Sequence, residues 1–316
     1  NQENMQFQKA WFYNEYGPTE VLHCGEYPVP ELGANQVLVR VRAAALNPVD
    51  FKRRNGLFKD IDSEFPAVPG CDMAGVIVDQ GDDVTKFCKG DEVYGNIQNF
   101  TSGTPKQCGT LTQYTAVEES LIALKPGNMS FEEAASFPLA LQTAQEAFDR
   151  VNFQKGQTVF IVGGAGGVGS LAIQLAKYVY GASDIATTTS TAKMSFVKKL
   201  GADMVMDYTK ESYEQITEKF DFVFDTVGDS HSSYVLAKDG GQIIDIANGS
   251  PHDKALFFMV TPSGNNLERL RGYIECERLK PVIDPASPHV FSNVVEAFHH
   301  LESGRARGKI VISSID

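Results

Sequence analysis

Hydrophobic and polar positions alternate in two different ways along this chain. In the first third, residues 37–45 alternate apolar and basic side chains over their first half, as a half-buried strand does, and glycines and prolines then divide the sequence into short segments. From about residue 130, short apolar runs alternate instead with helical stretches. The first pattern predicts an irregular, Greek-key-like β domain, and the second predicts a domain built on a parallel sheet.

The second pattern predicts a series of β-α units. Strands are expected at 158–162, 184–189, 203–206, 221–225 and 241–246, and helices near 167–180, 192–200, 210–218 and 230–238. A helical stretch at 131–150, interrupted at Pro138, precedes them, and 254–260 offers one further strand. Helical patterns at 264–277 and 291–303 and a last strand at 308–313 are expected to return to the first domain. Strands that alternate with short helices predict a doubly wound parallel sheet.

A glycine-rich run, Gly163 to Gly169, follows the apolar run 159–162 and precedes a helical stretch. From Gly164 it has the spacing G-x-G-x-x-G, in which glycines permit a tight turn, close approach of a pyrophosphate and packing of the helix on the strand. The helix N-terminus adds free N–H donors and a positive dipole end. The pattern predicts a dinucleotide site with contacts from Gly164, Gly166, Gly167, Val168 and Gly169.

The end of the next expected strand favours NADPH over NADH. An NAD site usually places an acid there to bind the ribose 2′-hydroxyl. The only acid nearby, Asp184, stands at the start of that strand, whereas Ser190, Thr191 and Lys193 follow its end. Hydroxyls and a cation suit a 2′-phosphate. The alternative is that Ser190 and Thr191 only cap the next helix, and both interpretations are compatible.

Composition excludes several classes of function. A formal net charge of −12 over 316 residues argues against nucleic acid or anionic membrane as a main partner. Five scattered cysteines without a C-x-x-C pair indicate reduced thiols and no structural zinc lobe. No apolar run approaches the roughly 20 residues of a membrane span. A cytoplasmic protein is expected, or a plastid one if an upstream segment was removed, acting as a monomer or homodimer on a small molecule.

Motifs along nearly the whole chain resemble the medium-chain dehydrogenase/reductase superfamily. They lie at 69–77, 90–95, 163–169, 200–203, 225–228 and 304–311. The resemblance implies a GroES-like β domain formed by 1–127 and 263–316, and an NADP-binding Rossmann domain, 128–262.

The zinc ligands of alcohol dehydrogenases in this superfamily are not matched. Those enzymes carry Cys where this chain has Asn47, and Gly-His-Glu where it has Gly70-Cys71-Asp72. No metal is therefore expected. The segment from Asn47 to Lys52 is similar to the zinc-independent quinone oxidoreductase branch, and the chain is most similar to plant-type enone/alkenal oxidoreductases. That resemblance implies NADPH-dependent reduction of the C=C bond of α,β-unsaturated carbonyls, or of quinones.

Site residues follow from the resemblance and from the chemistry. Lys52 and Asn47 are the candidate catalytic residues, because hydride addition to an enone needs donors for the developing oxyanion; both are also candidate cofactor contacts. Further cofactor contacts are expected from Thr143, Ser190, Lys193, Tyr208, Asp225, Val227, Gly228, Ala247, Gly249, Arg307 and Lys309. Candidate pocket residues are Phe58, Phe65, Cys71, Tyr94 and Phe258.

Simpler interpretations of some of these residues, and other functions, are also compatible with the sequence. Lys52-Arg53-Arg54 is a basic run, and most such runs are solvated. Cys71 is more simply a small buried residue than a reactive thiol. For function, the alternatives are a reductase of quinones only, a carbonyl-to-alcohol dehydrogenase, which would lack its usual Lewis acid, and an NADPH-binding protein with little turnover.

Overall fold

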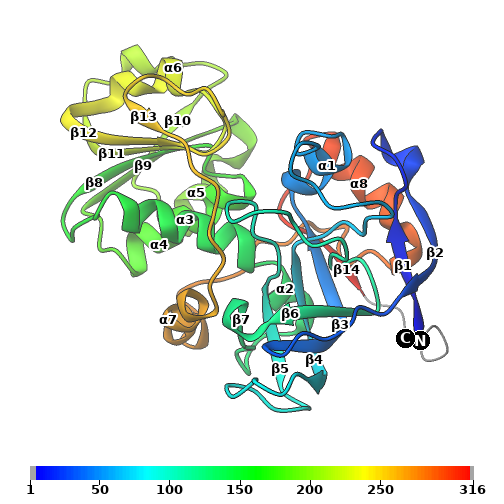
Figure 1. Ribbon diagram of the computed structural model, residues 1–316. Coiled ribbons are helices and arrows are strands. Elements are labelled where there is room, and N and C mark those ends of the chain that lie inside the picture. The colour runs from blue at the N-terminus through cyan, green and yellow to red at the C-terminus, as the bar shows by residue number, and fades with distance from the viewer. Residues whose placement is uncertain (1–4, 314–316) are drawn as a thin grey trace. The chain divides into compact units, whose positions relative to one another are not determined.

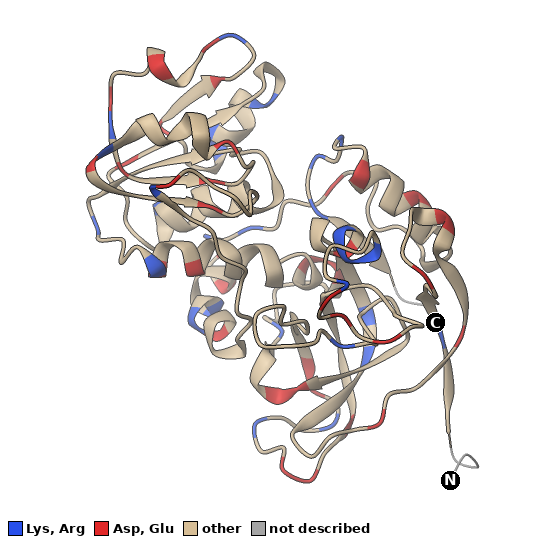
Figure 2. Cartoon of the chain, turned by 45° about the horizontal axis from the view of Figure 1, so that its top comes forward, with Lys and Arg blue, Asp and Glu red and all other residues tan. Residues whose placement is uncertain are grey.

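The computed structural model describes residues 5–313, which form two compact units. Among the described residues, the first unit comprises 5–139, 261–275 and 281–313, and the second comprises 140–260 and 276–280. The first boundary therefore falls at residue 140, twelve residues after the start expected for the nucleotide domain, because the helix Phe131–Ala135 packs on strands of the first unit. Basic and acidic residues are interspersed along both units (Figure 2).

The first unit is built on an antiparallel sheet. Its strands run in the order β14-β3-β4-β5-β7, with β6 paired to β3, and β1 and β2 form a separate two-stranded sheet (Figure 1). The strands are β1 (Phe7–Phe12), β2 (His23–Pro28), β3 (Gln36–Leu46), β4 (Asp72–Gln80), β5 (Glu92–Asn96), β6 (Tyr114–Glu118), β7 (Ile122–Leu124) and β14 (Ile310–Ser313). The C-terminal β14 pairs with β3, so the end of the chain returns to this unit.

Helices cover parts of this sheet. They are α1 (Pro48–Arg54), α2 (Phe131–Ala135), α7 (Gly264–Glu275) and α8 (Val294–Glu302). Alternating positions of β3, among them Val37, Val39 and Val41, are buried, as the alternation of apolar and basic residues predicted. Val294 and Phe298 of α8 join the same hydrophobic core.

The second unit is a doubly wound parallel sheet. Its strands are β8 (Thr158–Val162), β9 (Asp184–Thr189), β10 (Met204–Asp207), β11 (Phe220–Asp225), β12 (Ala237–Asp245) and β13 (Ala255–Leu256). Its helices are α3 (Pro138–Arg150, of which the first two residues belong to the other unit), α4 (Gly167–Tyr178), α5 (Met194–Leu200) and α6 (Ser230–Ser233). The strand order β10-β9-β8-β11-β12-β13 places the reversal of winding at β8 and β11. This is the Rossmann arrangement expected from the alternation of strands and helices.

One expected helix, 210–218, is wrong. Only a short 3-10 turn, Tyr213–Gln215, forms there. The side chain of Gln215 accepts a hydrogen bond from the Ser212 amide, but Ile216 is already extended and the chain soon enters β11. The segment 210–218 must connect to the central strand β11, and this tertiary constraint prevents the helix that its local sequence favours.

Within the described residues, no helix is long and apolar enough to cross a membrane.

Candidate active site

The glycine turn after β8 contains two kinds of glycine. Gly163 has φ +89°, and a Cβ at Gly164 or Gly169 would lie 2.1 Å from Thr187 Oγ1 or 1.9 Å from Gly163 O, so the fold itself requires these glycines. Gly166 differs, because its φ is −77° and a Cβ there would meet only Gly163 O, at 3.5 Å. The protein does not fill the space beside Gly166, which fits the close approach of a ligand.

Helix α4 begins directly behind this turn. Gly166 is its N-cap, and the amides of Gly167, Val168 and Gly169 form the first helical turn, where no i−4 carbonyl within the helix is available to them. Gly167 and Val168 are half-buried, whereas Gly169 is buried. These amides, with the positive end of the helix dipole, form an anion site of the kind that binds a pyrophosphate.

The predicted cofactor residues of the second unit follow the carboxyl ends of parallel strands. The pairs β10–β9, β9–β8, β8–β11 and β11–β12 are all parallel, so the ends of these strands meet at one edge of the sheet. The residues that come after them are Gly164, Ser190, Tyr208, Val227 and Ala247. Ligands of doubly wound sheets bind at this edge, near the point where the winding reverses.

Three candidate phosphate contacts converge behind β9 and β10. Thr189 pairs with Asp207 in the parallel register, and the Tyr208 amide donates to Thr189 O at 3.2 Å. The Lys193 amide donates to Ser190 O at 3.1 Å. Ser190 stands at the N-cap of the following turn without a side-chain capping bond, and Tyr208 is 60% exposed. These hydroxyls and the half-buried Lys193 are therefore available for a 2′-phosphate.

An acid that sequence reasoning did not single out, Asp207, organises this corner. One carboxylate oxygen accepts from the Thr209 amide (3.0 Å) and hydroxyl (2.6 Å), and the other accepts from Thr191 Oγ1. These bonds, that of Thr191 first, lower the pKa of Asp207. The hydroxyl that could have capped the next helix, Thr191, is thus committed to Asp207. Asp184, by contrast, stands at the first position of β9, at the opposite end of the strand.

Two buried carboxylates hold the loops after β11 and β12. Asp225 accepts from the amides of Val227 and Gly228, both at 2.9 Å, and from the Ser233 hydroxyl at 2.8 Å. Asp245 does the same for Ala247, at 3.0 Å. Asp225 is fully buried and shapes the loop, while Val227 is 57% exposed. The contacts of both residues with the cofactor stay predictions.

The remaining cofactor candidates of this unit lie in different settings. Gly249 has open space around its Cα, and Thr143 is buried in α3.

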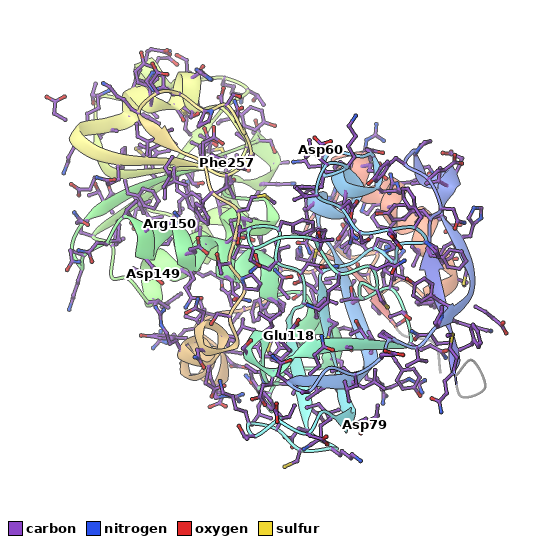
Figure 3. All side chains as sticks on the ribbon, viewed as in Figure 1. Asp60, Asp79, Glu118, Asp149, Arg150 and Phe257 are labelled. Carbon is purple, nitrogen blue, oxygen red and sulfur yellow. The ribbon has the colours of Figure 1, made fainter. Side chains whose placement is uncertain are left out.

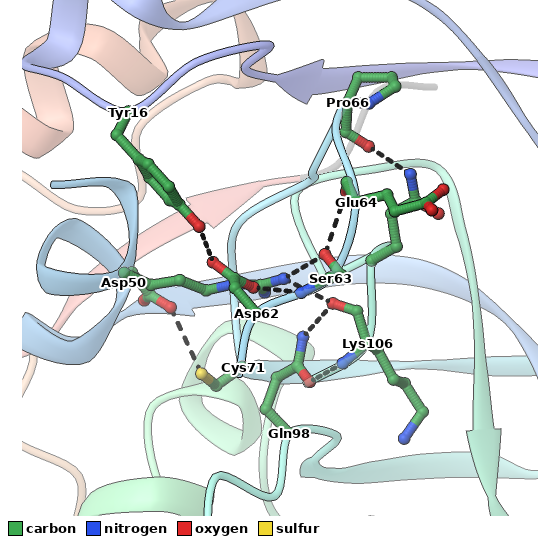
Figure 4. Close-up of polar contacts among 11 residues, drawn as sticks. Tyr16, Asp50, Asp62, Ser63, Glu64, Pro66, Cys71, Gln98 and Lys106 are labelled. Carbon is green, nitrogen blue, oxygen red and sulfur yellow. Dashed lines mark hydrogen bonds and ion pairs between the residues drawn. The ribbon is translucent and has the colours of Figure 1, made fainter. Parts of the chain in front are cut away.

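In the first unit, α1 carries the basic run Lys52-Arg53-Arg54, and its three cations have different environments. Arg53 is buried and pairs with Asp62 at 2.9 Å, as the close-up in Figure 4 shows around Asp62. Arg54 is fully buried, pairs with Glu302 at 2.7 Å and stacks over Phe298. Lys52 alone is exposed. The interpretation of the whole run as a solvated face is therefore wrong for both arginines.

The start of α1 is anchored in a group of buried polar residues, the Asn47 cluster, which comprises Asn47, Asp50, Cys71, Asp72 and Lys309. Asp50 Oδ2 accepts from the Asn47 amide at 2.8 Å, and Asn47 Nδ2 donates to Asp72 Oδ2 at 3.0 Å. Lys309 Nζ donates to Asn47 Oδ1 and, at 3.2 Å, to Leu46 O. The Cys71 thiol donates to Asp50 Oδ1 at 3.3 Å (Figure 4).

Burial dominates the protonation of this cluster. It raises the pKa of Asp72 to about 7, although Lys309 and Asn47 act in the opposite direction. It also raises the pKa of Asp50 and lowers that of Lys309, against the attraction of the nearby carboxylates. The pKa of Cys71 is held well above its ordinary value by burial and then by Asp50. Cys71 is therefore a packing thiol rather than a nucleophile.

Sequence reasoning expected Asn47 to donate to the reactants and Lys309 to contact the cofactor. Both contacts remain predictions. The side chain of Asn47 is 1% exposed and both ends of its carboxamide are engaged, so its placement favours an anchoring role. Lys309 is buried, whereas Arg307, two residues earlier, is exposed and carries no such contacts on its side chain. The burial of Lys309 could not be read from the sequence, because its partners lie more than 260 residues away.

The five candidate pocket residues lie in different settings, and their place in a substrate pocket stays a prediction. Tyr94 lies in β5 and is 1% exposed, and Phe65 packs edge-on against Tyr13 and Tyr16. Phe258 is covered by the guanidinium of Arg150, which is labelled in Figure 3. Cys71 belongs to the Asn47 cluster. Phe58, half-buried, contacts Phe100 at a centroid distance of 4.8 Å, and of the five it lies nearest in sequence to Lys52.

No group of three or more His, Cys, Asp and Glu residues suited to a metal ion occurs among residues 5–313. At the positions where zinc enzymes of the superfamily carry ligands, Asn47 binds Asp72 and Cys71 binds Asp50. The expectation that the protein holds no metal stays a prediction for elemental analysis.

Comparison with known proteins assigns the family. Residues 33–127 match the alcohol dehydrogenase GroES-like domain, and residues 200–312 match the zinc-binding dehydrogenase model. The chain belongs to the medium-chain dehydrogenase/reductase family. It is an oxidoreductase of that family, and its zinc-independent features agree with the branch that the motifs indicated.

Individual relatives span almost the whole chain. A 2-methylene-furan-3-one reductase of Solanum lycopersicum is 50% identical over 97% of this chain and 79% of its own length. An NADPH-dependent alkenal/one oxidoreductase, chloroplastic, of Arabidopsis thaliana is 48% identical over 97% of this chain and 80% of its own. The crystal structure of a quinone oxidoreductase from Coxiella burnetii is 31% identical, with a TM-score of 0.87, and covers 98% of this chain and 100% of that one.

Proposed function

We propose that this protein reduces the activated C=C bond of α,β-unsaturated carbonyl compounds with NADPH. The single observation that carries the cofactor is the unfilled space at Gly166, in front of the α4 N-terminus. The substrate class is supported by the two plant relatives, which are named as a furanone reductase and an alkenal/one oxidoreductase.

The residues present fit NADPH rather than NADH. The α4 amides would hold the pyrophosphate, and Ser190, Lys193 and Tyr208 would bind the 2′-phosphate through two hydroxyls and one cation. No carboxylate at the end of β9 competes for the ribose, because Asp184 lies at the other end of that strand. NADPH, when bound, supplies the hydride of the reaction.

Lys52 supports the chemistry from the first unit. Hydride addition at the β-carbon leaves negative charge on the carbonyl oxygen, and an exposed ammonium stabilises such charge. The α-carbon then takes its proton from water. Asn47 holds the start of the helix that carries Lys52, through its contacts with Asp50, Asp72 and Lys309.

A second candidate substrate is a quinone. The Coxiella burnetii quinone oxidoreductase has the same fold over nearly all of this chain, and a chloroplastic quinone-oxidoreductase homolog of Spinacia oleracea is 31% identical over 95% of it. An activated C=C bond and a quinone ring both accept hydride with charge developing on oxygen, so the same residues serve both.

Labelled cofactor tests the proposal directly. NADPH carrying deuterium at the transferred position is incubated with a simple alkenal, a cyclic enone, and an ortho- and a para-quinone, and the products are identified. We expect deuterium on the β-carbon of the reduced enone. Label on the carbonyl carbon, giving an allylic alcohol, would identify a carbonyl reductase, and no consumption with any substrate would identify an NADPH-binding protein.

The compartment and the oligomeric state are also proposals. We propose a cytoplasmic or plastid location, with chloroplastic relatives supporting the latter, and a monomer or homodimer. Fractionation of the source tissue and light scattering of the purified protein test them.

A further inference from the structure

Helix α1 is short but fixed at both of its ends by buried charged groups. At its start, Asn47 is bound through its amide, its Nδ2 and its Oδ1 by Asp50, Asp72 and Lys309. At its end, the buried Arg53 and Arg54 form ion pairs with Asp62 and Glu302. A helix of seven residues has little stability of its own, so these contacts determine where it lies.

Lys52 is the only exposed cation of the basic run on this helix. It stands five residues after Asn47, before the two buried arginines. No hydrogen bond or ion pair of its own side chain holds it among the described residues, so its position depends on the helix backbone. A change at either anchor would therefore displace the ammonium of Lys52 without touching it.

Among the residues that bind Asn47 at the start of α1, Lys309 is the most distant in the sequence. It is buried and directly precedes β14, and its ammonium donates both to Asn47 Oδ1 and to the carbonyl of Leu46, the last residue of β3. It also faces two buried carboxyl groups, Asp50 and Asp72, and attracts their ionised forms, which burial disfavours. The ammonium thus ties the C-terminal segment to the junction of β3 and α1.

We propose that Lys309 is a positioning residue for the reaction: it fixes Asn47 and the start of α1, and thereby the location of Lys52. This inference rests on the proposed function, in which Lys52 stabilises the developing oxyanion. It assigns to Lys309 a role behind the reacting groups in place of a contact with the cofactor.

A double-mutant cycle tests this. Lys309→Met, Lys52→Ala and the combined variant are compared by kcat and by the KM for NADPH, with a simple alkenal as substrate. We expect Lys309→Met to lower kcat about 10- to 100-fold, as loss of a supporting contact behind a functional group does. The KM for NADPH stays unchanged, and Lys309→Met causes no further loss when Lys52 is already Ala.

Two further variants serve as a control and as a replacement in case Lys309→Met does not fold. Arg305→Met, at an exposed position in the same segment, should leave kcat unchanged. If Lys309→Met does not fold, because it leaves two buried carboxylates unbalanced, the charge-balanced pair Asp72→Asn with Lys309→Met replaces it in the cycle.

The outcomes separate the two proposals. Equal losses of kcat from Lys309→Met in the presence and absence of Lys52 would overturn the positioning role and leave the role of Lys52 intact. Unchanged kcat in Lys309→Met would also overturn it. Unchanged kcat in Lys52→Ala would overturn the proposed role of Lys52, and the positioning role with it.

Discussion

Two regions that carry candidate site residues, one in each unit, treat their polar groups in opposite ways. In the Asn47 cluster, carboxylates, carboxamide and ammonium bind one another and are buried, and only Lys52 is presented to solvent. At the strand edge of the second unit, the buried acids Asp207, Asp225 and Asp245 also bind their own loops, but the α4 amides, Ser190 and Tyr208 remain available. A self-satisfied cluster gives rigidity, whereas unfilled donors give binding.

The largest effect is expected from Lys52→Ala, which tests the region of the first unit that contains the Asn47 cluster. If the cluster exists to hold one exposed cation in place, losing that cation should lower turnover by ~10²–10³, as loss of an oriented donor to an oxyanion does. The dissociation constant for NADPH should change much less. Steady-state kinetics beside calorimetric titration give both values, and Lys59→Ala, another exposed lysine seven residues on, is the matched control. Parallel losses of turnover and NADPH binding would place Lys52 on the cofactor instead.

The region of the second unit can be tested at Gly166, in the glycine turn before α4. In Gly166→Val the Cβ would meet the protein only at ordinary contact distance, 3.5 Å from Gly163 O, so the melting temperature should change little while NADPH binding is lost. Two hydrogen bonds to a charged group, at roughly 1.5–3 kcal/mol each, correspond to at least about a 100-fold weaker affinity.

Gly169→Ala is the contrasting change, because its Cβ would lie 1.9 Å from Gly163 O. That variant should lose thermal stability. If Gly166→Val binds NADPH as tightly as the unchanged protein, the turn does not hold the pyrophosphate.

A smaller change separates the two nicotinamide cofactors. Lys193→Ala removes one charge-assisted contact, worth roughly 1.5–3 kcal/mol, and should weaken NADPH about tenfold or more while NADH is unaffected. Calorimetric titration of both nucleotides against both proteins gives the comparison. Lys199→Ala, exposed in the same helical segment, serves as control. An equal effect on NADH would mean that Lys193 contacts a part common to both cofactors.

The last prediction concerns the pH dependence of stability that arises from the Asn47 cluster. The folded protein holds a proton on Asp72 up to about pH 7, whereas an exposed carboxyl releases it near 3.8. The folded state therefore binds more protons in that window, and the contribution of Asp72 to the free energy of unfolding falls as pH rises from about 4 to 7.

Asp72→Asn should remove this slope. Urea unfolding at pH 5 and pH 7.5 measures it, with Asp60→Asn, at an exposed carboxylate labelled in Figure 3, as control. An identical pH dependence in Asp72→Asn and the unchanged protein would mean that Asp72 is ionised throughout.

Local pattern sufficed for much of the second unit. The strands 158–162 and 184–189 begin and end as the apolar runs predicted, and the glycine turn lies where its spacing required. The candidate 2′-phosphate residues could also be predicted, because Ser190 and Lys193 follow shortly after the end of β9. Where the pattern failed, at 210–218, the chain had to reach β11 in few residues, which is a constraint of the sheet and not of the segment.

What the sequence determined by itself is the family, the parallel sheet with its glycine turn, and the difference at 47, 71 and 72 from the zinc ligands of alcohol dehydrogenases. Only the tertiary structure decided which of three adjacent cations is exposed, and that Asn47 and Lys309, 262 residues apart, share one buried cluster. The physical reason is range: periodicity and turn chemistry act over a few residues, whereas burial and its effect on charge depend on which distant segments pack together.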